Sequence, residues 1–185
     1  MKVPGPNWMR WRVRLGYPIA ALAFWLALPT PAALAAGAVV AVGGLLIRGA
    51  AAGHLRKHEE LATSGPYAWT RNPLYLGSAF LATGFLIVGN SLALAAIVTI
   101  YFSVFYAAVM SREAAELRER YGAAFDEYAA QVPLFFPRPR VARGRASASE
   151  ARFSWARYRR NREYQAALAT LLALAALAAK MMLWK

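Results

Sequence analysis

Five apolar segments alternate with shorter polar stretches along this chain. They cover Leu15 to Leu28, Ala32 to Ile47, Leu74 to Val88, Leu92 to Val109 and Ala166 to Leu183. Pro29-Thr30-Pro31 separates the first two segments, and Gly89-Asn90-Ser91 separates the third from the fourth. A membrane-spanning helix needs about 20 mostly apolar residues, so the shorter segments must recruit flanking residues to cross a bilayer. The pattern predicts an all-α, polytopic membrane protein with about five transmembrane helices, arranged as two hairpins followed by a C-terminal helix.

The same pattern divides the chain into three parts. Residues 1–137 hold the two predicted hairpins and form the membrane core. Residues 138–163 are rich in arginine, with Phe153, Trp155 and Tyr158 interleaved, as in a basic cytoplasmic linker or an interfacial segment on an anionic leaflet. Residues 164–185 contain the additional C-terminal transmembrane helix.

Composition and charge support a membrane protein and orient it. The chain has 185 residues, 59% of them hydrophobic, and a formal net charge of +13, with a mean hydropathy of +0.33. If the N-terminus is cytoplasmic, the basic residues of the flanks and loops lie inside, and only Lys180 and Lys185 lie outside. The positive-inside rule therefore predicts this orientation. We expect an integral protein of a bacterial inner membrane, with membrane lipids and no nucleic acid as partners, because the charges flank apolar spans.

The N-terminus has an alternative interpretation. A basic start, an apolar run and Ala33-Leu34-Ala35-Ala36 resemble a secretory signal with a small-residue cleavage site. Cleavage there would leave the first hairpin without one of its helices, so we favour an uncleaved first span.

Cysteine and histidine content limits the possible chemistry. The chain has no cysteine and two histidines, His54 and His58. We therefore expect no thiolate nucleophile and no metal site.

A polar segment stands where the chain enters the third predicted span. Asn72 suits a helix N-cap and Pro73 suits the first helical position, so the third helix is predicted to begin at Pro73. The first-turn amides of that helix and the neighbouring Arg71 form a predicted site for a carboxylate or a phosphate.

The residues around this helix start could surround a ligand. Gly65-Pro66 predicts a turn that brings backbone close to a ligand, and Tyr67 and Tyr75 supply flat aromatic faces. The alternative is an ordinary helix start with interfacial aromatic residues and a snorkelling arginine.

A second polar cluster, residues 111–122, follows the fourth predicted span. Glu113 lies within a turn of the bilayer boundary, where an unpaired carboxylate is costly and usually has a partner. Both clusters open onto the same face in the predicted topology. Together they are complementary to a zwitterionic ligand that also carries a cation or ribose hydroxyls.

The two clusters carry a resemblance to a known family. The residues concerned are Leu61 to Tyr67, Arg71 to Gly77, Glu113, Leu117, Tyr121-Gly122, Phe125, Tyr128 and Val132-Pro133. In this order they resemble the isoprenylcysteine carboxyl methyltransferase and phospholipid methyltransferase superfamily, over roughly Leu61 to Pro137. Many relatives have His where this chain has Asn72, and they usually carry a second glutamate where this chain has Ala114.

The resemblance implies a membrane-embedded methyltransferase that uses S-adenosylmethionine, held on the cytosolic side by residues 61–137. The implied cofactor-binding residues are Gly65, Pro66, Tyr67, Arg71, Asn72, Pro73, Tyr75 and Glu113. Methyl transfer from a sulfonium needs mainly the alignment of donor and acceptor, so no catalytic residue is specified. An amine acceptor would need a base, for which His54 and His58 are candidates, although an interfacial structural role suits each of them better.

The methyl acceptor is expected to be a lipophilic or small molecule. Two alternative functions stay open: an NAD(P)H-dependent membrane reductase on a related scaffold, and a non-catalytic relative. Reductases of that kind are typically longer and have more spans, and Ala114 is the best support for a non-catalytic protein.

Overall fold

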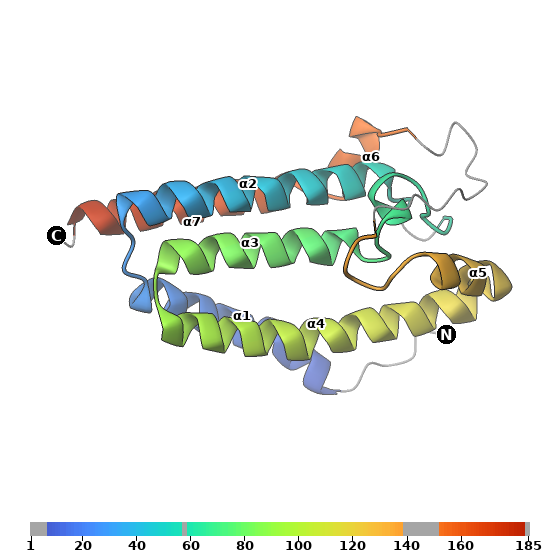
Figure 1. The fold of residues 1–185 in the computed structure, drawn as a ribbon, viewed down its shortest axis with the longest axis horizontal. Helices are drawn as coiled ribbons and strands as arrows, with labels where there is room; N and C mark the ends of the chain where they lie inside the picture. Colours follow the sequence, from blue (N-terminus) through green and yellow to red (C-terminus); the bar gives the residue numbers. More distant parts are fainter. Residues whose placement is uncertain (1–6, 57–58, 139–151, 184–185) are drawn as a thin grey trace.

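The computed structural model describes residues 7–56, 59–138 and 152–183 (Figure 1). The helices in these ranges are α1 (Asn7–Leu26), α2 (Pro31–His54), the 3-10 helix η1 (Gly65–Ala68), α3 (Pro73–Gly89), α4 (Leu92–Tyr121), α5 (Ala123–Gln131), α6 (Trp155–Arg160) and α7 (Tyr164–Leu183). Of these, α2, α4 and α7 are long and apolar enough to cross a membrane, and α3 is a shorter apolar helix of 17 residues. The predicted all-α membrane fold is confirmed, and its five spans correspond approximately to these four helices and α1.

Local capping signals define the two hairpins. Thr30 caps α2 by accepting a hydrogen bond from the Ala33 amide at 3.2 Å, and Ser91 caps α4 by accepting one from the Leu94 amide at 3.4 Å. Asn90 ends α3 in a left-handed conformation with φ 47°. Both predicted hairpin turns are therefore confirmed.

The long helices lie lengthwise beside one another, so the molecule has two distinct ends (Figure 1). α2 packs along α3, while α1 contacts α4 and α7 contacts α2. The two hairpin turns and the C-terminal end of α7 lie at one end, which we call the turn end. The opposite end carries η1, α5 and α6, and we call it the loop end.

Paired glycines allow α2 and α3 to approach closely. A methyl group on Gly37 would lie 2.4 Å from the Gly84 carbonyl oxygen, and one on Gly44 would lie 2.7 Å from the Gly77 carbonyl oxygen. The members of each pair are two helical turns from those of the other pair, so all four glycines lie along one interface. Small residues at such an interface are the usual means of close helix packing in membranes.

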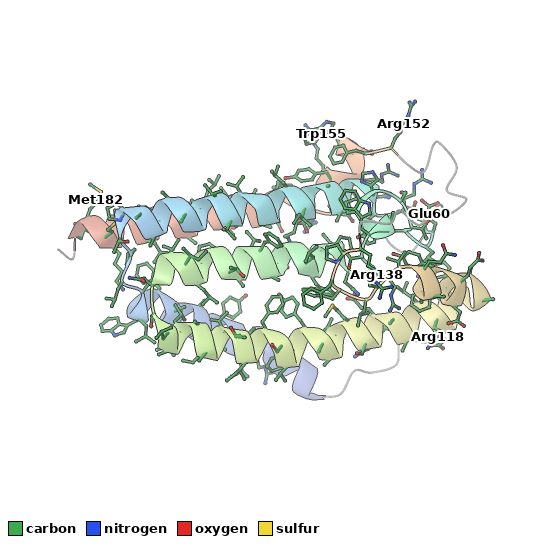
Figure 2. All side chains as sticks on the ribbon, in the orientation of Figure 1. Glu60, Arg118, Arg138, Arg152, Trp155 and Met182 are labelled. Carbon is green, nitrogen blue, oxygen red and sulfur yellow. The ribbon has the colours of Figure 1, made fainter. Side chains whose placement is uncertain are left out.

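Charged side chains gather at the loop end. Figure 2 shows Glu60, Arg118, Arg138 and Arg152 there, whereas Met182 lies at the turn end. α4 has 30 residues, which at about 1.5 Å per residue exceeds a hydrocarbon core of about 30 Å. Its last turns therefore project beyond the apolar region into the loop end.

The described part of the predicted basic linker, residues 152–163, closes over the end of α2. The Ser154 amide donates to the Gly53 carbonyl at 3.0 Å. The side-chain amide of Asn161 donates to the carbonyls of Ala52 and Leu55 at 2.9 and 3.1 Å. These bonds satisfy carbonyls that a helix C-terminus leaves without partners.

Candidate functional site

A cavity of about 490 Å³ lies at the loop end, between the end of α2, the start of α3, the last turns of α4, and α5. We call it the polar cavity because charged side chains, including Arg48, Arg71 and Glu113, line it beside apolar ones. Its lining includes the predicted residues Tyr67, Arg71, Asn72, Pro73, Tyr75 and Glu113. Gly65 and Pro66 begin the η1 turn and are not among the lining residues. The structure thus brings most of the predicted cofactor residues around one cavity.

The loop before α3 is held in place by α5 and by the segment that follows it. The Arg71 amide donates to the Pro133 carbonyl at 2.9 Å, and the Tyr128 hydroxyl donates to the Tyr67 carbonyl at 2.7 Å. Burial raises the pKa of Tyr67 and of Tyr128 above the ordinary tyrosine value. Both phenols therefore stay neutral near pH 7 and serve for packing and hydrogen bonding.

Asn72 precedes α3 as predicted, but its side chain does not cap the helix. Its side-chain amide donates to the Leu134 carbonyl at 2.9 Å, and it makes no capping bond to the first turn of α3. The predicted capping bond is therefore wrong: the NH2 group of this side chain is bound to the Leu134 carbonyl of the segment after α5, and its oxygen accepts no hydrogen bond from the start of α3. The predicted helix start at Pro73 is confirmed, and the first-turn amides of α3 donate no hydrogen bond to the Asn72 side chain.

Arg71 brings a positive charge to the cavity wall. Its guanidinium carbon lies 5.8 Å from the centre of the Phe125 ring, and its Nε is buried without a hydrogen-bond partner. Burial lowers the pKa of Arg71 from its ordinary value, yet that value is so high that the side chain stays charged. A buried Nε–H without a hydrogen-bond partner is costly, and an anionic group in the cavity would be attracted to the partly exposed guanidinium.

Glu113 and Tyr75 join α4 to α3 at the cavity. The Tyr75 hydroxyl donates to Glu113 Oε1 at 2.5 Å. The Tyr75 ring also meets the Tyr106 ring edge to face, with 5.2 Å between the ring centres. Tyr75 is thus a partner of the kind expected for a carboxylate at the membrane boundary.

Ala114 occupies an apolar part of the cavity wall. It packs against the buried cluster of Phe125, Tyr128 and Val132 and also lines the cavity. Glu116, one turn on from Glu113, lines the cavity too, but it pairs with Arg112 at 2.7 Å.

His54 lies against Gly65 at the start of η1 and is not among the residues that line the cavity. Its Nδ1 is 2.8 Å from the Ala50 carbonyl oxygen, which can only accept, so Nδ1 donates. A Cβ on Gly65 would lie 2.6 Å from His54 Nε2. The ring therefore packs the turn that precedes Tyr67, and a role as base stays a prediction. His58 lies outside the described residues.

Sequence reasoning missed an ion pair at this site, between Arg48 of α2 and Glu163 just before α7. Arg48 lines the cavity. Its Nη2 and Nε lie 2.7 and 2.9 Å from the two carboxylate oxygens of Glu163. Its Nη1 donates to Ser78 Oγ at 2.6 Å and to the Leu74 carbonyl at 3.3 Å. The position of Arg48 at the end of an apolar segment indicates a partner, but Glu163 is 115 residues away, so no local spacing identifies it.

The fold defines an integral membrane protein with a candidate ligand cavity at the loop end. The phospholipid methyltransferase family model matches residues 11–124, and the chain belongs to this family. Family membership places it among the membrane methyltransferases, while α6 and α7 lie outside the matched residues.

Two curated relatives are metal resistance proteins by name. The nickel-cobalt-cadmium resistance protein NccN of Alcaligenes xylosoxydans xylosoxydans is 41% identical over 83 residues, which are 45% of this chain and 38% of NccN. The cobalt-zinc-cadmium resistance protein CzcN of Cupriavidus metallidurans is 37% identical over 92 residues, which are 50% of this chain and 42% of CzcN. The matched segments thus span less than half the length of these relatives. No solved structure matches the chain significantly.

Proposed function

We propose that the protein uses S-adenosylmethionine to methylate a lipophilic acceptor at the loop end of the bundle. The polar cavity is the observation that carries this proposal, because it combines Arg71 with Glu113 in about 490 Å³. This volume lies within the range of about 300–1,000 Å³ that is usual for ligand sites. The residues fit the cofactor, which carries a carboxylate, an amino group, a sulfonium and ribose hydroxyls.

Each lining residue has a role that follows from its chemistry. Arg71 and the first-turn amides of α3 bind the methionyl carboxylate. Glu113, oriented by Tyr75, accepts hydrogen bonds from ribose hydroxyls or the amino group. The rings of Tyr67 and Tyr75 pack against the adenine or the sulfonium. When bound, S-adenosylmethionine supplies an electrophilic methyl group, and the residues contribute by holding it in line with the acceptor.

A second cavity favours a lipophilic acceptor over a small polar one. It measures about 370 Å³ and is lined mainly by apolar side chains of α1, α3, α4 and α7. Tyr75 lines the polar cavity and Ser78, about one turn further along α3, lines the apolar one. An acceptor with its chain in the apolar cavity would present its reacting group near Tyr75 and Tyr106, whose rings are in contact and line the polar and the apolar cavity respectively.

The loop end is proposed to face the cytosol of a bacterial inner membrane. In the predicted topology most basic residues lie on the side of the loop end, in keeping with the positive-inside rule. A water-soluble cofactor would then enter the polar cavity from the cytosol, and the acceptor would enter from the lipid.

The names of the two relatives refer to metal resistance and do not name a methyl acceptor. In the ranges that the structure describes, no group of three or more His, Cys, Asp or Glu residues could hold a metal ion. The acceptor is therefore proposed from the two cavities.

Binding of S-adenosylhomocysteine to the full chain in detergent, measured by calorimetry, tests the proposal. We expect Arg71→Ala and Glu113→Ala each to weaken binding by about 10- to 100-fold, because a hydrogen bond to a charged group contributes about 1.5–3 kcal/mol. Arg118→Ala is the matched control, since Arg118 also lies 5.8 Å from the Phe125 ring but is exposed and does not line the cavity. NADPH serves as the comparison ligand.

Three outcomes would contradict the proposal. Binding of NADPH in place of S-adenosylhomocysteine would indicate a reductase. Binding of neither ligand would indicate a non-catalytic relative. Unchanged affinity in both cavity variants would place the cofactor elsewhere.

A further inference from the structure

The apolar cavity begins beside the polar cavity, at the contact between the rings of Tyr75 and Tyr106, which we call the junction, and it reaches towards the turn end. At the junction, Tyr106 lines the apolar cavity and contacts Tyr75. Towards the turn end it is lined by Ala27, just after the end of α1, and by Gly89, the last residue of α3. A chain bound in this cavity would therefore extend along the helices, away from the cofactor site.

α7 supplies part of the wall of this cavity through Ala173 and Leu177. Leu177 is 6% exposed and packs with Ala27 and Val88 near the turn end. Ala173 lies one helical turn closer to the junction. The two side chains thus face successive depths of the same cavity.

A polar contact anchors the loop end of α7. Glu163, immediately before α7, pairs with Arg48 through both carboxylate oxygens. The Glu163 side chain is 11% exposed and that of Arg48 is 20% exposed. This bidentate geometry fixes the position of α7 relative to α2 and to the polar cavity.

A second polar contact anchors the turn end. The ammonium group of Lys180, a residue that is 8% exposed, donates to the carbonyls of Phe24, Trp25 and Ala27 at 2.6, 2.8 and 2.8 Å. These carbonyls lie at the C-terminal end of α1, where helix carbonyls lack partners and a cation is favoured. Lys180 therefore locks α7 onto α1 one turn beyond Leu177.

We infer that α7 sets the length of the apolar chain that the acceptor carries, with Ala173 and Leu177 as the specificity-determining residues. This inference rests on the proposed function for its acceptor, and it assigns a role to a helix outside the matched family segment. Because both ends of α7 are anchored, the wall cannot move aside to admit a longer chain. The side-chain volumes at positions 173 and 177 therefore limit the depth of the cavity.

A photolabelling series tests this inference on the full chain in lipid nanodiscs. The probes are saturated fatty alcohols from octyl to octadecyl, each with a terminal diazirine, and the readout is the yield and position of cross-links by mass spectrometry. We expect wild-type labelling inside the cavity to fall beyond a limiting chain length. Ala173→Phe should lower labelling by the longest accepted probe by about tenfold or more, because a pocket discriminates by this much on small changes in size. Leu177→Ala should instead shift the limit to longer probes.

Matched substitutions on the exposed face of α7 control for general effects. Ala176→Phe and Leu172→Ala make the same chemical changes at exposed positions of the same helix and should leave the limit unchanged. Leu177→Ala, which enlarges the cavity, tests the inference by itself if Ala173→Phe fails to fold. The inference would be overturned if the chain-length limit stayed at its wild-type value in folded Ala173→Phe or Leu177→Ala protein. It would also be overturned if the limit shifted equally in the two controls.

Binding of S-adenosylhomocysteine, measured on the same preparations, separates the two proposals. If the protein binds S-adenosylhomocysteine but its chain-length limit does not change with substitutions at positions 173 and 177, only the role of α7 is overturned. Protein that binds no S-adenosylhomocysteine would overturn the proposed function, and with it the assignment of the apolar chain to a methyl acceptor.

Discussion

Gly65 adopts a left-handed backbone conformation with φ 58°, and the ring of His54 fills the space where a side chain would stand. Only glycine takes this conformation readily, since other residues pay about 1–2 kcal/mol for it. The turn it begins leads directly to Tyr67, which lines the polar cavity. Small changes at this position should therefore alter the proposed cofactor site.

We predict that Gly65→Ala lowers the melting temperature and weakens S-adenosylhomocysteine binding. Gly122→Ala is the matched control, because Gly122 has φ 53° but has no atom within 4 Å of the added methyl group. The control should show the cost of a positive φ in the absence of a steric contact. Equal melting temperatures and equal affinities in the two variants would show that the His54 contact has no influence on the site.

At the scale of elements, the bundle depends on side chains that connect helices distant in sequence. The Arg48–Glu163 pair links α2 to α7, and Nη1 of Arg48 extends the link to α3 through Ser78. Removing one member of a largely buried pair leaves the other charge uncompensated, which costs more than removing both.

We predict that Glu163→Gln and Arg48→Met each lower the free energy of unfolding, and that the double variant loses less than the sum. The coupling energy should be about 1–3 kcal/mol, as for residues in direct contact. The exposed pair of Arg118 and Asp126, whose side chains are 64% and 53% exposed, is the control, with an expected coupling of about 0–1 kcal/mol. Thermal unfolding of all variants in the same detergent gives the comparison, and a coupling no larger than that of the control would show that Arg48–Glu163 does not anchor α7.

For the whole molecule, the two ends of the bundle differ in chemistry. The loop end carries the cavity, the loop segments and the charged end of α4, whereas the turn end holds two tight hairpin turns. This asymmetry, with the distribution of arginines in the sequence, underlies the proposed cytosolic orientation of the site.

The orientation can be measured with single introduced cysteines, because the chain has no cysteine of its own. We predict that a membrane-impermeant thiol reagent applied to intact cells labels Leu92→Cys, at a position that is 91% exposed at the turn end. Glu127→Cys, exposed on α5 at the loop end, should react only after the membrane is permeabilised. The reverse pattern would invert the proposed topology, and the native protein controls for background labelling.

Features that depend on neighbouring residues were predictable from the sequence. The helix start at Pro73 and the turns at Pro29 and Asn90 follow from proline, capping and left-handed residues acting within a few positions. The hairpin arrangement follows from the length of the apolar segments, because lipid leaves no other way to satisfy the backbone.

Side-chain partners across the bundle were harder to predict. Asn72 stands at the expected position, but its amide binds the Leu134 carbonyl, and that choice depends on where the segment after α5 passes. Lys180 was expected only as an outer flanking charge, yet it binds the end of α1. Both outcomes depend on which helix lies beside which.

By itself the sequence determined the all-helical membrane class, the order of the hairpins and a set of candidate site residues most of which line the polar cavity, because apolar segment length, capping and local motifs act over short distances. Only the tertiary structure decided that Arg48 pairs with Glu163, that Lys180 locks α7 to α1, and that an apolar cavity lies beside the polar one. These contacts join residues more than 100 positions apart or arise from the packing of four helices. Their geometry depends on how the folded helices are placed, which no local pattern in the sequence records.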